Sequence, residues 1–175
     1  MKINISNLSQ GAHEYELSKE AVDLGLKENF IGDVVAKVTV DKSSRQILLR
    51  AGIRSRAHFQ CDRCLQEFEK EIAPTLQTFY VWNSEELEGD KYDDVRTLSA
   101  DMNIIDISGD VRDVVLLAVP LKLLCKDECA GLCPQCGKNL NQMPDGICDC
   151  APRDVDPRWN KLAGLVEVSI SKKKN

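Results

Sequence analysis

The chain has 175 residues, of which 43% are hydrophobic and 29% charged, and its formal net charge is −5. This composition is typical of a soluble globular protein, and the length allows one ordinary core together with a small metal-stapled module. The acidic balance excludes a global electrostatic attraction to RNA, so any contact with nucleic acid has to be local.

The sequence also lacks the signals of export and of membrane insertion. No apolar run approaches the ~20 residues that cross a bilayer. The N-terminal sequence has no basic region followed by an apolar run of the kind that directs secretion. We therefore expect a cytoplasmic protein that makes no membrane contact.

The start of the chain predicts two short strands and one brief helix. The strands are expected around Ile3 and around Tyr15. For the helix, Ser18 is the expected N-cap and Gly25 the expected stop. Serine readily caps a helix N-terminus, and glycine readily adopts the left-handed conformation that ends a helix.

A β-meander is predicted from Asp33 to Phe59, because apolar residues recur there at every second position. If Val40 pairs with Ile47 across the intervening turn, the apolar side chains of both strands lie on one face. The sequence therefore predicts strands with one buried and one exposed face.

The next hairpin turns at the pair Cys61 and Cys64. Pairing Gln60 with Leu65 keeps the apolar side chains on the core face and produces a two-stranded arm with a metal-binding turn at its tip. On the outer face, this register places His58, Arg56 and Arg54 opposite Glu67, Glu69 and Glu71, in that order. We therefore interpret the two arginines as ion-pair partners in preference to phosphate contacts.

Arg50 has no such explanation and is a candidate RNA contact. The aromatic run at residues 79–82, which follows Pro74, is assigned to the core in preference to a base-stacking platform. Residues 1–82 are thus predicted to form an antiparallel β core that carries a zinc-knuckle hairpin at residues 61–64.

Residues 83–101 are rich in acidic and poor in apolar groups, which indicates an exposed connection. Residues 102–124 are predicted to complete the core with a strand at 102–107 and a helix. The helix has Ser108 as its N-cap and ends at Pro120. Its expected buried stripe consists of Val111, Val114, Val115 and Ala118.

Six of the eight cysteines lie between Cys125 and Cys150, and their spacing groups them in pairs. Paired thiolates are how a chain assembles a tetrahedral zinc site. A reducing compartment disfavours disulfides, and the single residue between Cys148 and Cys150 suits a mutual disulfide poorly. A thioredoxin-like role for Cys61 and Cys64 requires a helix after the second cysteine, but the sequence there alternates like a strand.

We therefore predict two zinc ions, each held by four cysteines, and loop length decides how the pairs combine. The last two pairs are separated by only 11 residues that include turn-forming glycine and proline, so closing that loop costs little. By elimination, the pair at the tip of the arm joins the first pair of the C-terminal segment and ties that segment to the sheet. The predicted sites are Cys61, Cys64, Cys125 and Cys129 for one ion, and Cys133, Cys136, Cys148 and Cys150 for the other.

Residues 125–166 are predicted to form a zinc-ribbon-like module that ends in a short helix, with Asp156 as N-cap and Pro157 at the first helical position. Residues 167–175 form a basic tail. The tail is either simply solvated or in contact with RNA phosphates. The candidate RNA contacts outside the β core are Lys138, Lys172, Lys173 and Lys174.

Several segments carry a resemblance to a known family. They are CDRCL at 61–65, VLLAVPLKLLC at 115–125, GLCPQCGKNLN at 131–141, CDC at 148–150 and DPRW at 156–159. In this order they resemble the YceD family, also called large ribosomal RNA subunit accumulation proteins, over nearly the whole chain. The resemblance implies a role in the accumulation or processing of 23S ribosomal RNA, in bacteria and in plastids, and it supplies no catalytic residues.

The predicted fold is α+β, an antiparallel β-meander or partly open barrel with few short helices and a C-terminal zinc-ribbon-like module. The favoured hypothesis is a non-enzymatic factor that binds ribosomal RNA or a ribosomal protein and takes no small-molecule substrate, with zinc holding the binding surface in shape. The chain has only two histidines, and no site with three ligands and an open position is predicted, as hydrolytic zinc requires. The alternatives are a zinc-containing enzyme, such as a nuclease or thiol oxidoreductase, and a zinc-ribbon transcription module.

Overall fold

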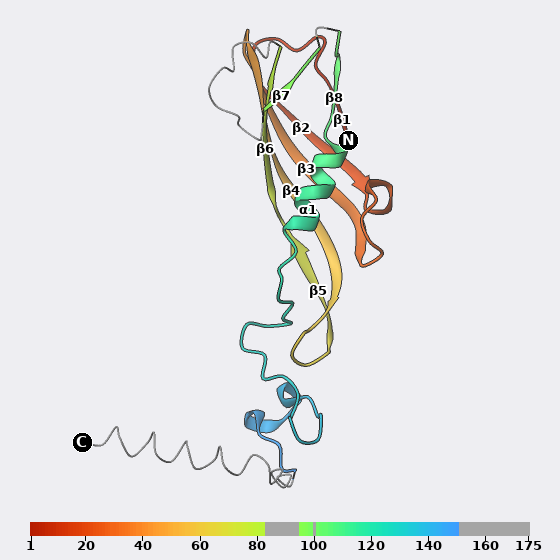
Figure 1. The fold of residues 1–175 in the computed structure, drawn as a ribbon, viewed down its shortest axis with the longest axis vertical. Coiled ribbons are helices and arrows are strands. Elements are labelled where there is room, and N and C mark those ends of the chain that lie inside the picture. The colour runs from red at the N-terminus through yellow and green to blue at the C-terminus, as the bar shows by residue number, and fades with distance from the viewer. Residues whose placement is uncertain (83–94, 100, 151–175) are drawn as a thin grey trace, which may run out of the picture. The chain divides into compact units, whose positions relative to one another are not determined.

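The computed structural model describes residues 1–82, 95–99 and 101–150. In these residues the protein is mostly β-sheet with few helices (Figure 1). None of the helices in the described ranges is both long enough and apolar enough to cross a membrane.

The chain divides into two compact units, and the first comprises residues 1–62 and 66–127. It contains an open six-stranded sheet with the order β2-β3-β4-β6-β7, in which β5 pairs with the second half of β4 and β6 with the first half. All pairs are antiparallel except β6–β7. The strands are β2 (Gly11–Glu20), β3 (Phe30–Lys42), β4 (Gln46–Gln60), β5 (Glu67–Ile72), β6 (Thr75–Val81) and β7 (Val95–Thr97). A separate two-stranded sheet joins β1 (Lys2–Asn4) to β8 (Ile104–Asp106). The open sheet confirms the predicted β core in outline.

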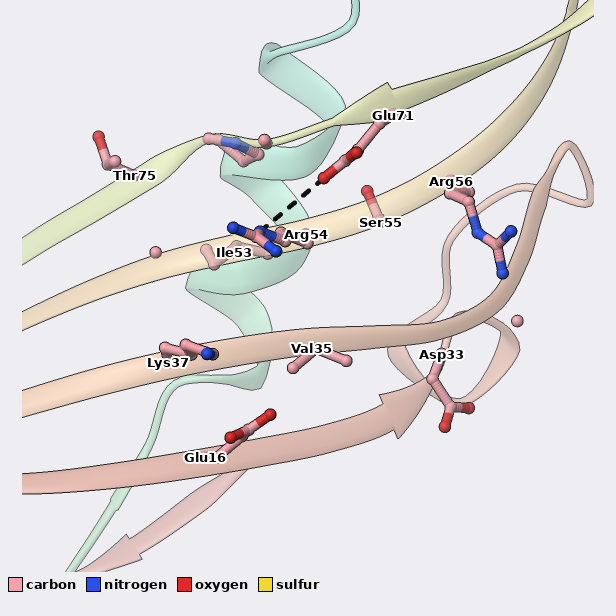
Figure 2. Close-up of a pocket in the computed structure, with 14 residues that line it drawn as sticks. Glu16, Asp33, Val35, Lys37, Ile53, Arg54, Ser55, Arg56, Glu71 and Thr75 are labelled. Atoms are coloured by element: carbon pink, nitrogen blue, oxygen red, sulfur yellow. Dashed lines mark ion pairs between the residues drawn. The ribbon is translucent and has the colours of Figure 1, made fainter.

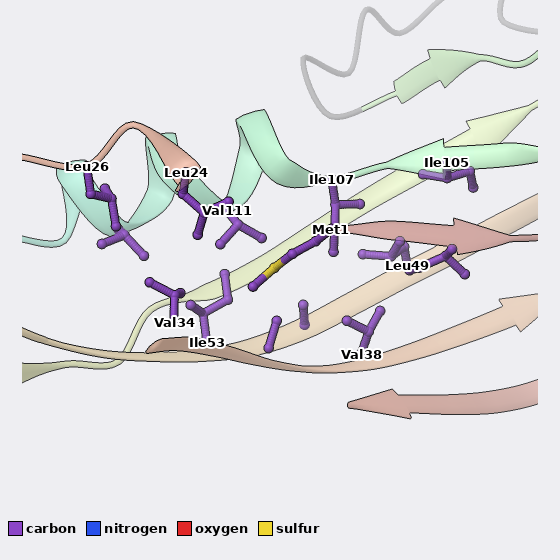
Figure 3. Packing of buried hydrophobic residues seen from close by; sticks show 14 of the residues in the cluster. Met1, Leu24, Leu26, Val34, Val38, Leu49, Ile53, Ile105, Ile107 and Val111 are labelled. Carbon is purple, nitrogen blue, oxygen red and sulfur yellow. The ribbon is translucent and has the colours of Figure 1, made fainter. Parts of the chain in front are cut away.

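The core of this unit lies between one face of the sheet and the helix α1 (Ser108–Leu117) (Figure 3). Val38 and Leu49 come from the sheet, and Val111 and Val115 come from the helix; each is at most 1% exposed. Burying an aliphatic side chain of this kind contributes roughly 1.5–3 kcal/mol relative to leaving it in water. The alternation in the sequence therefore predicted correctly which face of β3 and β4 is buried.

The predicted register between β3 and β4 was wrong by two residues. Val40 lies opposite Leu49, and Ile47 pairs with Lys42. The Ser43 side chain explains the shift, since its hydroxyl accepts a hydrogen bond from the N–H of Gln46 and tightens the turn. Because successive side chains of a strand point to opposite faces, a shift of two residues leaves every side chain on its predicted face.

The register between β4 and β5 was wrong by the same amount. Gln60 pairs with Glu67, not with Leu65, and His58 and Arg56 lie opposite Glu69 and Glu71. Leu65 has a positive φ of 59° and belongs to the turn, so strand pairing begins only beyond it. Arg54 nevertheless lies 3.9 Å from Glu71, the partner predicted for it, whereas His58 lies 3.6 Å from Glu69 and not beside the predicted Glu67.

The predictions for the helices need three corrections. Ser18 lies in β2, and the brief helix is a 3-10 turn, η1 (Val22–Leu24), which does end at Gly25 as predicted. Ser108 is the first residue of α1 and not its N-cap; its N–H donates to the carboxylate of Asp106. The helix α1 ends at Leu117, before the predicted end at Pro120, and Ala118 is therefore exposed and not part of the buried stripe.

The predicted acidic connection lies mostly outside the described residues, but Val95–Thr97 within it forms β7. Arg96 of this strand forms an ion pair with Asp110 in the first turn of α1. Of the aromatic run, Tyr80 is buried in the core as predicted, whereas Phe79 points to the opposite face of the sheet.

The second unit comprises residues 63–65 and the chain from 128 onward. It is held by turns, by an isolated bridge between Leu132 and Asn139, and by two 3-10 helices, η3 (Leu140–Gln142) and η4 (Pro144–Gly146). The predicted helix after Asp156 and the basic tail lie outside the described residues.

Candidate metal centres

One cysteine group lies wholly within the second unit and consists of Cys133, Cys136, Cys148 and Cys150. Their four sulfur atoms lie within 4.8 Å of one another. The sulfurs of Cys133 and Cys150 are 3.5 Å apart, and those of Cys136 and Cys148 are 3.4 Å apart. Sulfurs at about 2.3 Å from one zinc ion lie about 3.8 Å from each other, so this spacing suits a shared ion and not a disulfide of about 2.05 Å.

Backbone turns hold the first pair of this group in place. The N–H of Cys133 donates to the carbonyl of Lys138, and the N–H of Gly137 donates to the carbonyl of Cys133. Gly137 has a φ of 75°, a left-handed conformation that glycine adopts without steric cost. The glycine that follows Cys136 is therefore what allows the turn to close.

The same turn prepares Cys133 to bind a cation. Hydrogen bonds from the backbone N–H groups of Cys136 and Gln135 lower the pKa of the Cys133 thiol to about 6. This sulfur is then mostly ionised at neutral pH, and the thiolate is the form that binds metal. By contrast, the pKa of the Cys150 thiol is raised to about 12, chiefly by its hydrogen bond with Cys148 and, to a smaller extent, by that with Cys133. The Cys150 thiol therefore becomes a thiolate at neutral pH only when a cation offsets its charge.

Two local turns within the loop between Cys136 and Cys148 shape its path. The side chain of Asn139 caps η3 by accepting the N–H of Asn141, and Pro144 begins η4. These turns support the argument that closing this loop costs little.

The other cysteine group consists of Cys61, Cys64, Cys125 and Cys129, and its four sulfur atoms also lie within 4.8 Å of one another. Three of these cysteines are at most 4% exposed, and Cys125 is half-buried. Both groups have the members of the two predicted sites. That each group holds one zinc ion stays a prediction.

Two residues that the sequence analysis missed position chain segments beside these cysteines. In the first unit, the N–H of Asp62 donates to the carbonyl of Leu123 at 2.8 Å, and the Asp62 carboxylate accepts the N–H of Leu123 at 2.7 Å. In the second unit, the Arg63 guanidinium donates to the carbonyl of Cys129 at 2.9 Å. Gly131 has a φ of 79°, and a Cβ there would lie 3.3 Å from the Arg63 carbonyl oxygen. Asp62 and Arg63 lie between the cysteines of CDRC, and their place in that motif was the one signal that could have found them.

Asn141 is a third residue that the spacing of cysteines did not reveal. Its side-chain amide donates to the sulfur of Cys129 at 3.2 Å, and its carbonyl oxygen accepts the N–H of Ala130 at 3.0 Å. A hydrogen bond to a thiolate stabilises its charge and fixes its direction, as the hydrogen-bond partners of metal ligands commonly do.

The donor chemistry of both groups fits zinc. Four thiolates gathered at one point require a counter-charge, and four sulfur ligands complete the tetrahedral coordination of zinc with no open position. Zinc in such a site would cross-link the chain.

The candidate RNA contacts are scattered. Arg50 is exposed on the face of β4 that points away from the core, and Lys138 is exposed in the second unit. Lys172, Lys173 and Lys174 lie outside the described residues.

We predict that the purified protein contains two zinc ions, because eight thiolates in two closed groups satisfy two tetrahedral ions. Elemental analysis measures the number, and sulfur-only ligation should appear in the X-ray absorption spectrum. A single ion, or oxygen from water in the coordination shell, would contradict the prediction.

Comparison with known proteins gives a family match over most of the chain. The family model described as "Large ribosomal RNA subunit accumulation protein YceD" matches residues 49–166. A maize protein named "Large ribosomal RNA subunit accumulation protein YCED homolog 1, chloroplastic" is 30% identical over 77% of this chain and 57% of its own length. The Arabidopsis thaliana protein of the same name is 24% identical over 77% of this chain and 49% of its own length.

An uncharacterised protein of Mycobacterium tuberculosis is 27% identical over 73% of this chain and 59% of its own length. The chain therefore spans about half to three fifths of the length of these relatives. No solved structure matches the chain.

Proposed function

Because the chain belongs to the YceD family of large ribosomal RNA subunit accumulation proteins, we propose that it is a cytoplasmic, non-enzymatic factor in the accumulation of 23S ribosomal RNA. It acts by binding ribosomal RNA or a ribosomal protein through a surface that zinc holds in shape. The family match carries this proposal, and the maize and Arabidopsis relatives bear the corresponding names.

The chemistry of the cysteine groups supports a non-enzymatic role. Each group offers four sulfurs, whereas catalytic zinc sites keep three protein ligands and one open position. The two histidines have other partners, since His13 hydrogen-bonds the backbone carbonyl of Ser9 and His58 lies 3.6 Å from Glu69. Neither is paired with a cysteine as a catalytic base would be.

Crosslinking in living cells tests this proposal. Ultraviolet irradiation followed by purification of the tagged full chain is expected to recover fragments of 23S ribosomal RNA, or a ribosomal protein of the large subunit after chemical crosslinking. Cells that lack the protein should contain less 23S RNA relative to 16S RNA. An unchanged ratio, together with no ribosomal partner in either experiment, would contradict the proposal.

A further inference from the structure

The sheet of the first unit has one apolar face and one polar face. Along β4, Leu49 and Ile53 are buried while Arg50 and Arg54 are exposed, because successive side chains of a strand point to opposite faces. Figure 2 shows Lys37 and Arg54 on the polar face, with α1 behind the sheet. We call this polar face of β2, β3, β4 and β6 the outer face.

The outer face carries two adjoining hollows, of about 840 Å³ and about 250 Å³. Lys37, Gly52 and Thr75 line both. Gly52 lies in the middle of β4, and a Cβ added there would meet no atom within 4 Å. The missing side chain therefore leaves the surface open between the strands on either side.

The smaller hollow has the chemistry of a phosphate site. The charged side chains that line it are Lys37 and Arg50, and the polar neutral ones are Thr39, Thr75 and Gln77. Thr39 and Gln77 lie opposite Arg50 on its two neighbouring strands. In the described part of the chain, neither Lys37 nor Arg50 forms an ion pair. Two cations beside neutral hydrogen-bond donors are what a phosphate group requires.

The larger hollow differs from the smaller one because positive and negative side chains line it in equal number. Lys37, Arg54 and Arg56 line it together with Glu16, Asp33 and Glu71. Arg54 lies 3.9 Å from Glu71. An anion is therefore attracted to the smaller hollow in preference to the larger one.

A half-buried aromatic side chain lies next to the smaller hollow. Phe79 pairs with Leu48 across β6 and β4, one step along the outer face from the pair of Gln77 and Arg50. Phe79 and Leu48 are half-buried, and neither belongs to the hydrophobic core cluster or packs against it. Phe79 is thus the diagonal neighbour of Arg50 on the adjacent strand. Such diagonal pairs lie about 7–8 Å apart, which is within reach of a base joined to a phosphate at Arg50. Stacking on an aromatic ring needs an unpaired base.

We propose that the outer face binds single-stranded RNA, with a phosphate held by Lys37 and Arg50 beside Gly52 and a base stacked on Phe79. This inference rests on the proposed function and commits it to direct RNA contact. The bound RNA segment is short, and its base sequence has little effect on affinity, because the contacts are made to phosphate and to the face of a base.

The test measures the affinity of the zinc-loaded full chain for a short fluorescein-labelled single-stranded RNA of mixed sequence, by fluorescence anisotropy at several salt concentrations. Replacing Lys37 and Arg50 together with glutamine is expected to weaken binding and to reduce the slope of log affinity against log salt by about 1.4, because each cation that no longer neutralises the RNA backbone removes roughly 0.7 from the slope. Phe79→Leu should weaken binding about tenfold and leave the slope unchanged.

Gly52→Glu is the sharpest variant, because it adds a carboxylate to the floor of the hollow where a side chain has room. It should abolish binding by repelling the phosphate. Arg112→Gln is the matched control, since Arg112 is an exposed arginine of α1 on the opposite side of the sheet. Thermal unfolding and zinc content are measured for every variant and identify any that fail to fold. Only the variants that fold are then compared in RNA affinity.

Unchanged RNA affinity in the folded Gly52→Glu and Lys37→Gln/Arg50→Gln variants would overturn the inference. So would equal competition by fully paired duplex RNA, or crosslinks from this face to protein alone. The proposed function survives these outcomes if the wild-type protein still recovers 23S RNA or a ribosomal protein from cells, so the two proposals fail separately.

Discussion

Replacing Cys61 with serine is expected to leave the protein with one zinc ion, held by Cys133, Cys136, Cys148 and Cys150. Cys61 is fully buried, and a serine hydroxyl there does not replace a thiolate as a zinc ligand. The remaining group keeps its metal because its sulfur contacts and its turns all lie within its own stretch of chain. Structural zinc supplies about 10–16 kcal/mol of apparent binding free energy in small zinc domains, so losing one ion should be a large effect.

Cys148→Ser is the reciprocal variant and should retain only the ion of Cys61, Cys64, Cys125 and Cys129. Elemental analysis of both variants gives the zinc content, and limited proteolysis shows which part of the chain becomes susceptible. In Cys61→Ser the arm formed by β4 and β5 should be cleaved, and in Cys148→Ser the loop that follows Cys136. The double variant should bind no zinc. Loss of both ions from either single variant, or retention of two, would contradict the assignment of cysteines to ions.

Leu49→Ala is expected to lower the free energy of unfolding by about 3 kcal/mol, because it leaves a cavity in the core where Leu49 is 0% exposed. For a chain of this size the melting temperature should fall by about 6–12 °C. Leu48→Ala is the matched control, since Leu48 precedes Leu49 on the outer face and is only half-buried. Thermal unfolding followed by circular dichroism measures both. An equal loss in the control would mean that the two faces of β4 are not distinguished as described.

The faces of the strands could be predicted from the sequence, but their registers could not. Period-two alternation fixes which side chains are buried and is insensitive to a shift of two residues. The shift is decided by turn chemistry, through the hydroxyl of Ser43 in one hairpin and the left-handed conformation of Leu65 in the other. Neither turn has the Asn-Gly or Asp-Gly signature that specifies a register in advance.

The candidate sites were predictable to different degrees. Cysteine spacing identified the members of both groups, because closely spaced pairs of thiols are rare and are typical of metal sites. Asn141 could not be found, since its hydrogen bond to Cys129 depends on the folded loop. The smaller hollow depends on the register, because the shift of two residues places Lys37 beside Gly52 and Thr39 beside Arg50.

The position of Asn141 ties the length of one loop to both cysteine groups. The residue belongs to the segment that joins Cys136 to Cys148, yet its amide holds the sulfur of Cys129. A one-residue insertion near η4 is expected to leave Asn141 in place. The same insertion between Gly137 and Asn139 is expected to withdraw the amide from Cys129 and so to weaken the predicted metal site. Tolerance to insertions should therefore differ sharply between the two halves of this loop.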